Sequence, residues 1–181
     1  MKRLIVIVGI MLMVVGMVSV VRAGNPDTMS LTVTVTAALD VTIYATDYDF
    51  GTVALNSTTI STTSTAVKNT SATAVETYEL KVSAGNSGWT IADSTGTKDY
   101  VRIQAIWNTS QPASITDSTN YNLDTTGKTC NGTLFAGTET YDGDSVPQGG
   151  EEKLWFKLWT PSSTTTDGQK KFYLTITASL G

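Results

Sequence analysis

The pattern that decides the fold is plainest in residues 100–107, Tyr-Val-Arg-Ile-Gln-Ala-Ile-Trp, where alternate positions are all apolar. Successive side chains of a β-strand point to opposite faces of the sheet, so the apolar set shares one face. That set consists of Val101, Ile103, Ala105 and Trp107. We therefore expect a strand here with one face in a hydrophobic core.

The rest of the chain after residue 24 has the same character, because short β-patterned runs alternate with turns rich in Gly, Asn, Asp and Pro. No segment has the pattern of an amphipathic helix, and residues 108–150 are loop-rich. About eight strands at regular spacing predict an all-β fold, an antiparallel β-sandwich that is Ig-like or jelly-roll-like. The further strands are expected at residues 31–37, 41–44, 49–53, 59–67, 75–82, 153–159 and 172–178.

The first 23 residues have the pattern of a secretory signal peptide. Two basic residues precede an apolar run over residues 4–21, and Val21 and Ala23 supply the small side chains of a cleavage site. We expect cleavage after Ala23 and a single mature domain, residues 24–181, outside the cell or on its surface. The run is also close to the length of a membrane span, so an uncleaved N-terminal anchor is the alternative.

The charge of the mature chain excludes two classes of partner. The signal peptide removes three of the 12 basic residues, which leaves 9 against 16 acidic residues and a net charge of −7. An acidic chain lacks the basic stripe that nucleic acid requires, and an anionic lipid surface would repel it. We therefore expect neither a nucleic acid partner nor a membrane partner once the signal peptide is removed.

The absence of histidine from the sequence excludes several kinds of active site. Ser-His-Asp and Cys-His nucleophiles and the usual catalytic zinc ligand sets all need it. A glycosidase-like enzyme would need two carboxyl groups facing across a cleft. The clusters Glu151-Glu152, Glu76/Glu79 and Asp142/Asp144 do not identify such a pair. We predict a non-enzymatic protein without a cofactor.

Two further features of the composition concern metals and sulfur. Carboxylates two residues apart, at Asp47/Asp49 and Asp142/Asp144, suit turns, and neither stretch has the spacing of a calcium loop, so no metal site is predicted. Cys130 is the only cysteine, which excludes an intramolecular disulfide. It is either a small residue in the turn 127–132, or a thiol for an intermolecular disulfide or other reaction.

Residues 154–159, Leu-Trp-Phe-Lys-Leu-Trp, form a strand that is apolar on both faces. Trp155 and Trp159 share a face about 13 Å apart, and such a pair could stack against sugar rings. Two other interpretations are a central strand covered on both sides and an interface between subunits.

The first and last expected strands, residues 31–37 and 172–178, have alternating apolar residues and no internal proline, and the first has no charge. An exposed strand of this kind is a template for pairing with another chain, and strand donation joins neighbouring subunits in some filaments. We predict residues 31–37 as the donor, with Leu31, Val33 and Val35 as its apolar set. The alternative is that both strands pair with inner neighbours of one sandwich.

A weak family resemblance is carried by residues 49–82. Asp49-Phe50-Gly51-Thr52-Val53, then Val67-Lys68-Asn69-Thr70-Ser71, then Tyr78-Glu79-Leu80 resembles the pattern of bacterial extracellular immunoglobulin-like domains. The resemblance implies an Ig-like sandwich with a surface or structural role and no catalytic residues. The Thr-rich start of the mature chain is also loosely similar to secreted β-rich filament subunits.

These observations favour a secreted, non-enzymatic structural or interaction protein of the cell surface, in the form of a self-associating filament or matrix subunit. Its expected partners are itself or other surface proteins. The alternative is a carbohydrate-binding module that holds a polysaccharide on the face of Trp155 and Trp159.

Overall fold

In the part of the chain that the computed structural model describes, regular structure consists of nine β-strands and one short 3-10 helix. The residues described are 32–33, 37–45, 47–85, 88–94, 96–137 and 141–181. The elements, in chain order, are β1 (Val41–Ile43), β2 (Thr58–Ile60), β3 (Thr65–Asn69), β4 (Glu76–Ala84), β5 (Thr90–Ile91), β6 (Tyr100–Trp107), η1 (Thr119–Tyr121), β7 (Lys128–Thr129), β8 (Glu151–Trp159) and β9 (Phe172–Leu180).

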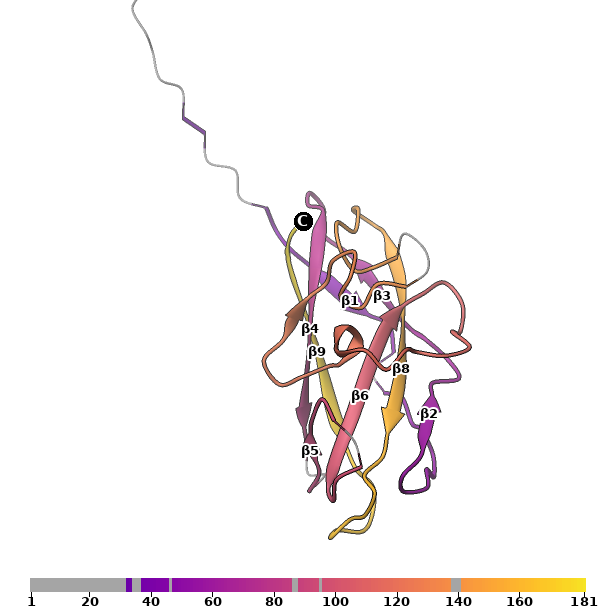
Figure 1. Ribbon diagram of the computed structural model, residues 1–181. Coiled ribbons are helices and arrows are strands. Elements are labelled where there is room, and N and C mark those ends of the chain that lie inside the picture. The colour runs from indigo at the N-terminus through magenta and orange to yellow at the C-terminus, as the bar shows by residue number, and fades with distance from the viewer. Residues whose placement is uncertain (1–31, 34–36, 46, 86–87, 95, 138–140) are drawn as a thin grey trace, which may run out of the picture. The chain divides into compact units, whose positions relative to one another are not determined.

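The strands form two sheets that pack against each other (Figure 1). The larger sheet has the order β1-β3-β8-β6-β5, with β2 also paired to β8, and the smaller has the order β7-β4-β9. Every pair is antiparallel except β5 with β6. The predicted all-β sandwich is confirmed.

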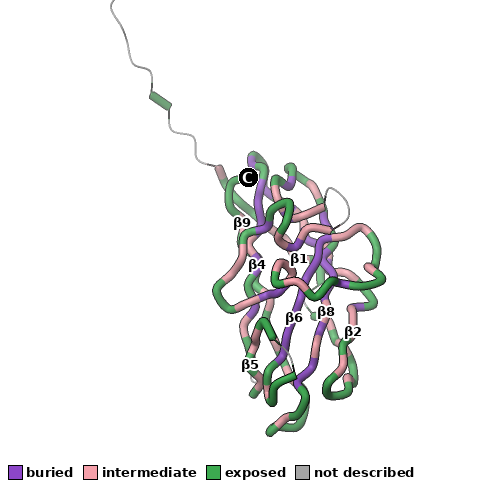
Figure 2. The backbone as a smooth tube through the Cα atoms, viewed as in Figure 1, coloured by how far each residue is buried: buried purple, intermediate pink, exposed green. Residues whose placement is uncertain are grey.

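The core lies between the sheets and is built from the alternating residues that the sequence pattern singled out. Val101, Ala105 and Trp107 of β6 are fully buried, and the Trp107 ring lies 5.8 Å from that of Tyr78 on β4. Figure 2 shows buried residues along β4, β6 and β8. A second, smaller cluster of Ile106, Ile115 and Trp155 lies apart from this core.

Strand β8 is the centre of the larger sheet, because it pairs with β3, β2 and β6. The expected strand 59–67 is divided into β2 and β3, which pair with different parts of β8. Between them the Ser61 hydroxyl accepts the N–H of Phe156 at 3.0 Å, and the Ser61 N–H donates to the Phe156 carbonyl at 2.8 Å. This exchange fixes the point where the chain bends from one strand to the next.

Two expected strands differ from the structure. Residues 49–53 are not a strand, because Gly51 adopts a positive φ of 67° and its N–H bonds the Asp49 carboxylate, which makes a turn. The strand at 31–37 falls mostly on residues outside those described, and the described Thr32 and Val33 are not in a strand.

The described part of residues 108–150 is irregular, as expected, and η1 and β7 are the only regular elements found in it. Ile115, Leu123 and Phe135 are buried and anchor this segment. The described residues include no helix of the length and apolarity needed to span a membrane. The apolar run 4–21 lies outside them.

Candidate functional site

Strand β9 forms an edge of the smaller sheet. All nine of its residues pair with β4, from Phe172 opposite Ala84 to Leu180 opposite Glu76, and no other described strand pairs with it. It is the yellow strand beside β4 in Figure 1. The other strands at described sheet margins, β1, β2, β5 and β7, have only two or three residues. Strand β9 is therefore the one long edge among the described strands.

The hydrogen-bond pattern shows which backbone groups of this edge point outward. Alternate residues of an antiparallel pair direct both N–H and C=O to the partner, and those between direct theirs away. Tyr78 of β4 accepts the Cys130 N–H on the β7 side, so the odd-numbered residues of β4 bond to β9. The register then turns the N–H and C=O of Leu174, Ile176 and Ala178 away from β4. Among the described residues these groups have no hydrogen-bond partner.

The same three residues carry the inward-facing side chains of β9. Ile176 is buried and Leu174 and Ala178 are half-buried, whereas Thr175 and Thr177 between them are exposed. Edge strands usually carry a charge, a proline or a bulge that prevents pairing with another chain. Residues 172–180 contain no charged residue and no proline, and the pairing with β4 is continuous. We call this outward row of backbone groups, with its inward side chains, the β9 edge.

Several exposed apolar side chains lie on β9 or beside β1 and β4. Eight large hydrophobic residues are exposed in the described chain, and five of them belong to β9 or lie next to β1 or the start of β4. Strands β1 and β9 lie close to each other. The five residues are Leu39, Tyr44, Val75, Tyr173 and Leu180.

The chain enters the domain at the end of the β9 edge. The Ser71 hydroxyl donates to the Ala38 carbonyl at 2.7 Å, and the Asp40 N–H donates to the Glu76 carboxylate at 2.7 Å. Glu76 lies opposite Leu180 in the β4–β9 register. Residues 38–40 are thus held beside the last residue of β9.

The predicted donor residues lie just before this entry point. Leu31 and Val35 are outside the described residues. Val33 is 84% exposed, the most exposed of the large hydrophobic side chains described.

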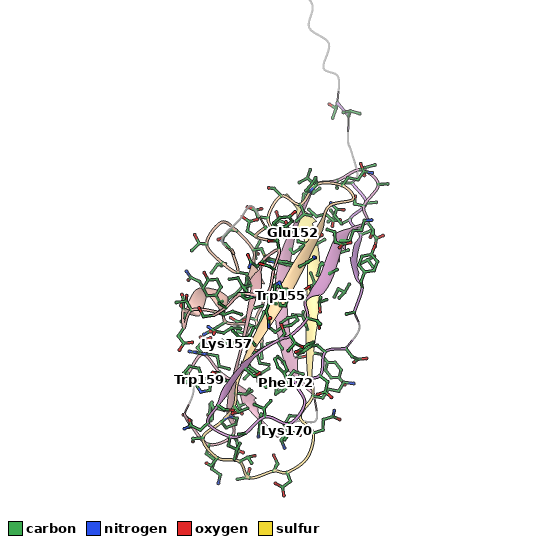
Figure 3. All side chains as sticks on the ribbon, turned by 90° about the vertical axis from the view of Figure 1, so that its right-hand side faces the viewer. Glu152, Trp155, Lys157, Trp159, Lys170 and Phe172 are labelled. Atoms are coloured by element: carbon green, nitrogen blue, oxygen red, sulfur yellow. The ribbon has the colours of Figure 1, made fainter. Side chains whose placement is uncertain are left out.

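Of the two tryptophans predicted to stack against sugar rings, Trp155 is buried. Trp155 is only 7% exposed, packs with Ile106 and Ile115, and donates from Nε1 to the Asn108 carbonyl at 2.8 Å. Figure 3 shows Trp155, Lys157 and Trp159 following one another along β8. Trp155 fits a central strand covered on both faces, because Leu154 beside it lies in the main core.

Trp159 is half-buried, and two positively charged side chains lie against its ring. The Arg102 guanidinium carbon lies 4.6 Å from the ring centroid and Lys157 Nζ lies 5.7 Å from it. Both cations bind Asp117, at 2.7 and 2.6 Å. The hydrogen bond from Lys157, with the charges of both cations, holds the pKa of Asp117 below its usual value. The two tryptophans do not form one open aromatic surface.

The carboxylate clusters are separated by the strand geometry. Glu152 of β8 is buried and accepts the Gly143 N–H at 2.8 Å, while the adjacent Glu151 is exposed. Glu76 is likewise buried, and Glu79, three residues further along β4, points to the opposite side of the strand. Burial is the main cause that raises the pKa of Glu152 from 4.5 to about 7, and the charges of the nearby Asp142 and Asp144 act in the same direction.

No group of three or more acidic or cysteine side chains that could hold a metal occurs among the described residues. A shallow pocket of about 110 Å³ is lined by Thr109, Tyr141, Glu151 and Lys153. Among the described residues that line it, Glu151 supplies one carboxylate and Lys153 one ammonium group.

Cys130 is buried within the main core. Its Sγ accepts the Trp107 Nε1–H at 3.3 Å, and burial raises the pKa of the thiol to about 12. Because the thiolate is the reactive form, this thiol is protected from oxidants and partners in the folded domain.

Some residues of interest were not foreseen from the sequence. The burial of Glu152, and the pairing of Arg102 with Asp117 over Trp159, depend on contacts between distant segments. The only sequence signal for these positions was the alternation of side chains along β8 and β6. It puts Glu152 on the same strand face as Leu154, and Arg102 on the same face as Gln104.

The chain was compared with protein-family models and with curated proteins. No family model matches it, and no curated protein matches it.

Proposed function

We propose that the mature chain is a secreted, non-enzymatic structural subunit of the cell surface that self-associates through strand pairing. Residues 31–37 act as the donor, with Leu31, Val33 and Val35 as the side chains that enter the neighbour. The N-terminal signal pattern supports export, and the acidic, histidine-free composition supports a structural role over a catalytic one.

The observation that carries the proposal is the β9 edge. It is long, uncharged and continuous, and its outward backbone groups lack a partner among the described residues. Edges of this kind pair readily with an added strand, whose main-chain hydrogen bonds supply affinity.

The test compares two variants of residues 24–181 by size-exclusion chromatography and negative-stain electron microscopy. Val33→Asp puts a charge on the apolar face of the donor, and Thr34→Asp puts the same charge on its other face. The unchanged chain and Thr34→Asp should assemble, while Val33→Asp should elute as a monomer. A monomeric unchanged chain would refute self-association, and equal assembly of both variants would refute the donor.

Carbohydrate binding is the weaker candidate. It needs two open tryptophan faces, and the structure buries Trp155 and places Arg102 over Trp159. A binding assay with a panel of polysaccharides tests it directly.

A further inference from the structure

We propose that the β9 edge is the acceptor and that its occupant is the segment 31–37 of a second copy of this chain, so that subunits join head to tail. This inference rests on the proposed function and adds the site on the neighbour, the matching of residues and the polarity of the assembly.

The pattern of the β9 edge matches the donor residue by residue. Residues directly opposite each other in adjacent strands share a face. The β9 residues whose backbone N–H and C=O point away from β4 are also the ones whose side chains point toward the core. A donor residue that pairs with one of them lies on the same face, so its side chain must point toward the core as well. The donor has three apolar residues at alternate positions, as many as the central outward row of β9. The two rows are Leu31, Val33 and Val35, and Leu174, Ile176 and Ala178.

The solvent-facing side of the proposed donor–β9 pair also fits the proposal. Thr32, Thr34 and Thr36 of the donor would line up with the exposed Thr175 and Thr177 of β9, and threonines suit a solvated, β-branched surface. Neither segment carries a charge, so no electrostatic repulsion opposes their pairing.

A second copy is favoured over the chain's own donor by the way the chain enters the domain. Residues 38–40 are bonded to Ser71, Thr70 and Glu76, at the end where β9 finishes. To reach its own β9 edge, the donor would have to reverse direction within these tethered residues.

Head-to-tail joining follows because donor and acceptor are different surfaces. Such a heterologous contact does not close on itself as a two-fold dimer does, so it extends into a filament or closes into a ring. A subunit without a working donor can still accept, and a subunit without a working acceptor can still donate.

Complementation between two variants tests this polarity. Val33→Asp disables the donor, and Ala178→Pro removes an outward N–H from the β9 edge while leaving the bonds to β4 intact. Each variant alone should be a monomer, and an equimolar mixture should form a dimer of twice the monomer mass and nothing larger. The matched control is Val41→Pro, which removes an outward N–H from β1 and should assemble like the unchanged chain.

Disulfide trapping gives a second measurement that does not depend on a proline. Thr34→Cys is combined with Thr175→Cys, Thr177→Cys or Ser179→Cys in the full mature chain, and the control is Lys81→Cys on β4. Strands are about 4.8 Å apart, so residue 81 lies about two strand spacings from the donor, beyond the ~4.4–6.8 Å Cα separation of a disulfide. Mild oxidation should join neighbouring subunits into a series of disulfide-linked oligomers, a covalent ladder, when Thr34→Cys is combined with at least one of the β9 cysteines. The combination of Thr34→Cys with Lys81→Cys should give no such ladder.

The outcomes separate the two proposals. If the unchanged chain does not assemble, the proposed function fails. If it assembles but gives no ladder with any β9 cysteine, and Ala178→Pro assembles normally, the acceptor lies elsewhere and only this inference is overturned. If Ala178→Pro proves unfolded by circular dichroism, the disulfide ladder alone decides.

Discussion

Glu152 should make the domain less stable as the pH rises through neutrality. Its pKa is raised from 4.5 to about 7 in the folded state, chiefly by burial. Between these two values the folded chain holds a proton that the unfolded chain has released, so the free energy of unfolding falls with increasing pH. Below about pH 4.5 both states are protonated and Glu152 has no effect.

The size of the effect follows from the two pKa values. A difference of about 2.5 pH units corresponds to about 3 kcal/mol once the pH is well above 7. Between pH 5 and pH 8 the predicted loss is about 2–3 kcal/mol. For a domain of this length that loss lowers the melting temperature by roughly 5–10 °C.

Glu152→Gln isolates this contribution, because the amide oxygen can still accept the Gly143 N–H and carries no charge. The assay is urea unfolding at a series of pH values from 5 to 8, followed by tryptophan fluorescence. The variant should be more stable than the unchanged chain at pH 8 and should show a flatter pH profile. Glu151→Gln, at the exposed neighbouring position, is the control and should keep the original slope. Equal slopes for the unchanged chain and Glu152→Gln would refute the reasoning.

Three further predictions concern the core. Cys130 should react with a thiol reagent many times more slowly in the native chain than in urea, and equal rates would show that the thiol is accessible. Gly143→Ala should cost about 2 kcal/mol or more, because the new Cβ would meet Trp107 Nε1 and lie 2.8 Å from Cys130 Sγ at a φ of +73°. The control Gly96→Ala, with open space around it, should lose only about 1 kcal/mol in the same urea titration. Trp155→Ala should lower the free energy of unfolding by about 3–5 kcal/mol, and unchanged stability would mean that its ring is not a packed core group.

The alternation of apolar and polar residues along the chain was sufficient to predict most of the strands. The apolar face of residues 100–107 lies in the core as expected, and the apolar residues of 172–178 face the same way. Hydrophobic periodicity works here because each strand has one face toward a single core. Periodicity did not predict the turn at Gly51. The residues around it alternate as in a strand, but the hydrogen bond from the Gly51 N–H to the Asp49 carboxylate and the positive φ of Gly51 make a local Asx turn.

The partners of each strand could not be predicted in the same way. That β9 lies at an edge, and that β8 is central, depends on which distant strands pair, and one strand's own residues do not encode this. The sequence did indicate that residues 172–178 form a strand with alternating apolar residues and no internal proline, which are the local features of the β9 edge. The covering of Trp155 by residues from the 108–121 segment is a long-range contact, so the spacing of the two tryptophans alone suggested a surface.

The central position of β8 also sets the time at which the domain can form. Strands β3 and β6 both need β8 as their neighbour, and β4 needs β9, yet these two strands occupy the last part of the chain. If the chain is exported N-terminus first, as its first 23 residues predict, neither sheet can close until residues 151–180 have crossed. Pairings between such distant segments form slowly, which keeps the polypeptide threadable during passage through a narrow channel. On the proposed mode of assembly, a subunit could not accept a donor before residues 172–180 had crossed, because β9 is the last of the described strands to emerge.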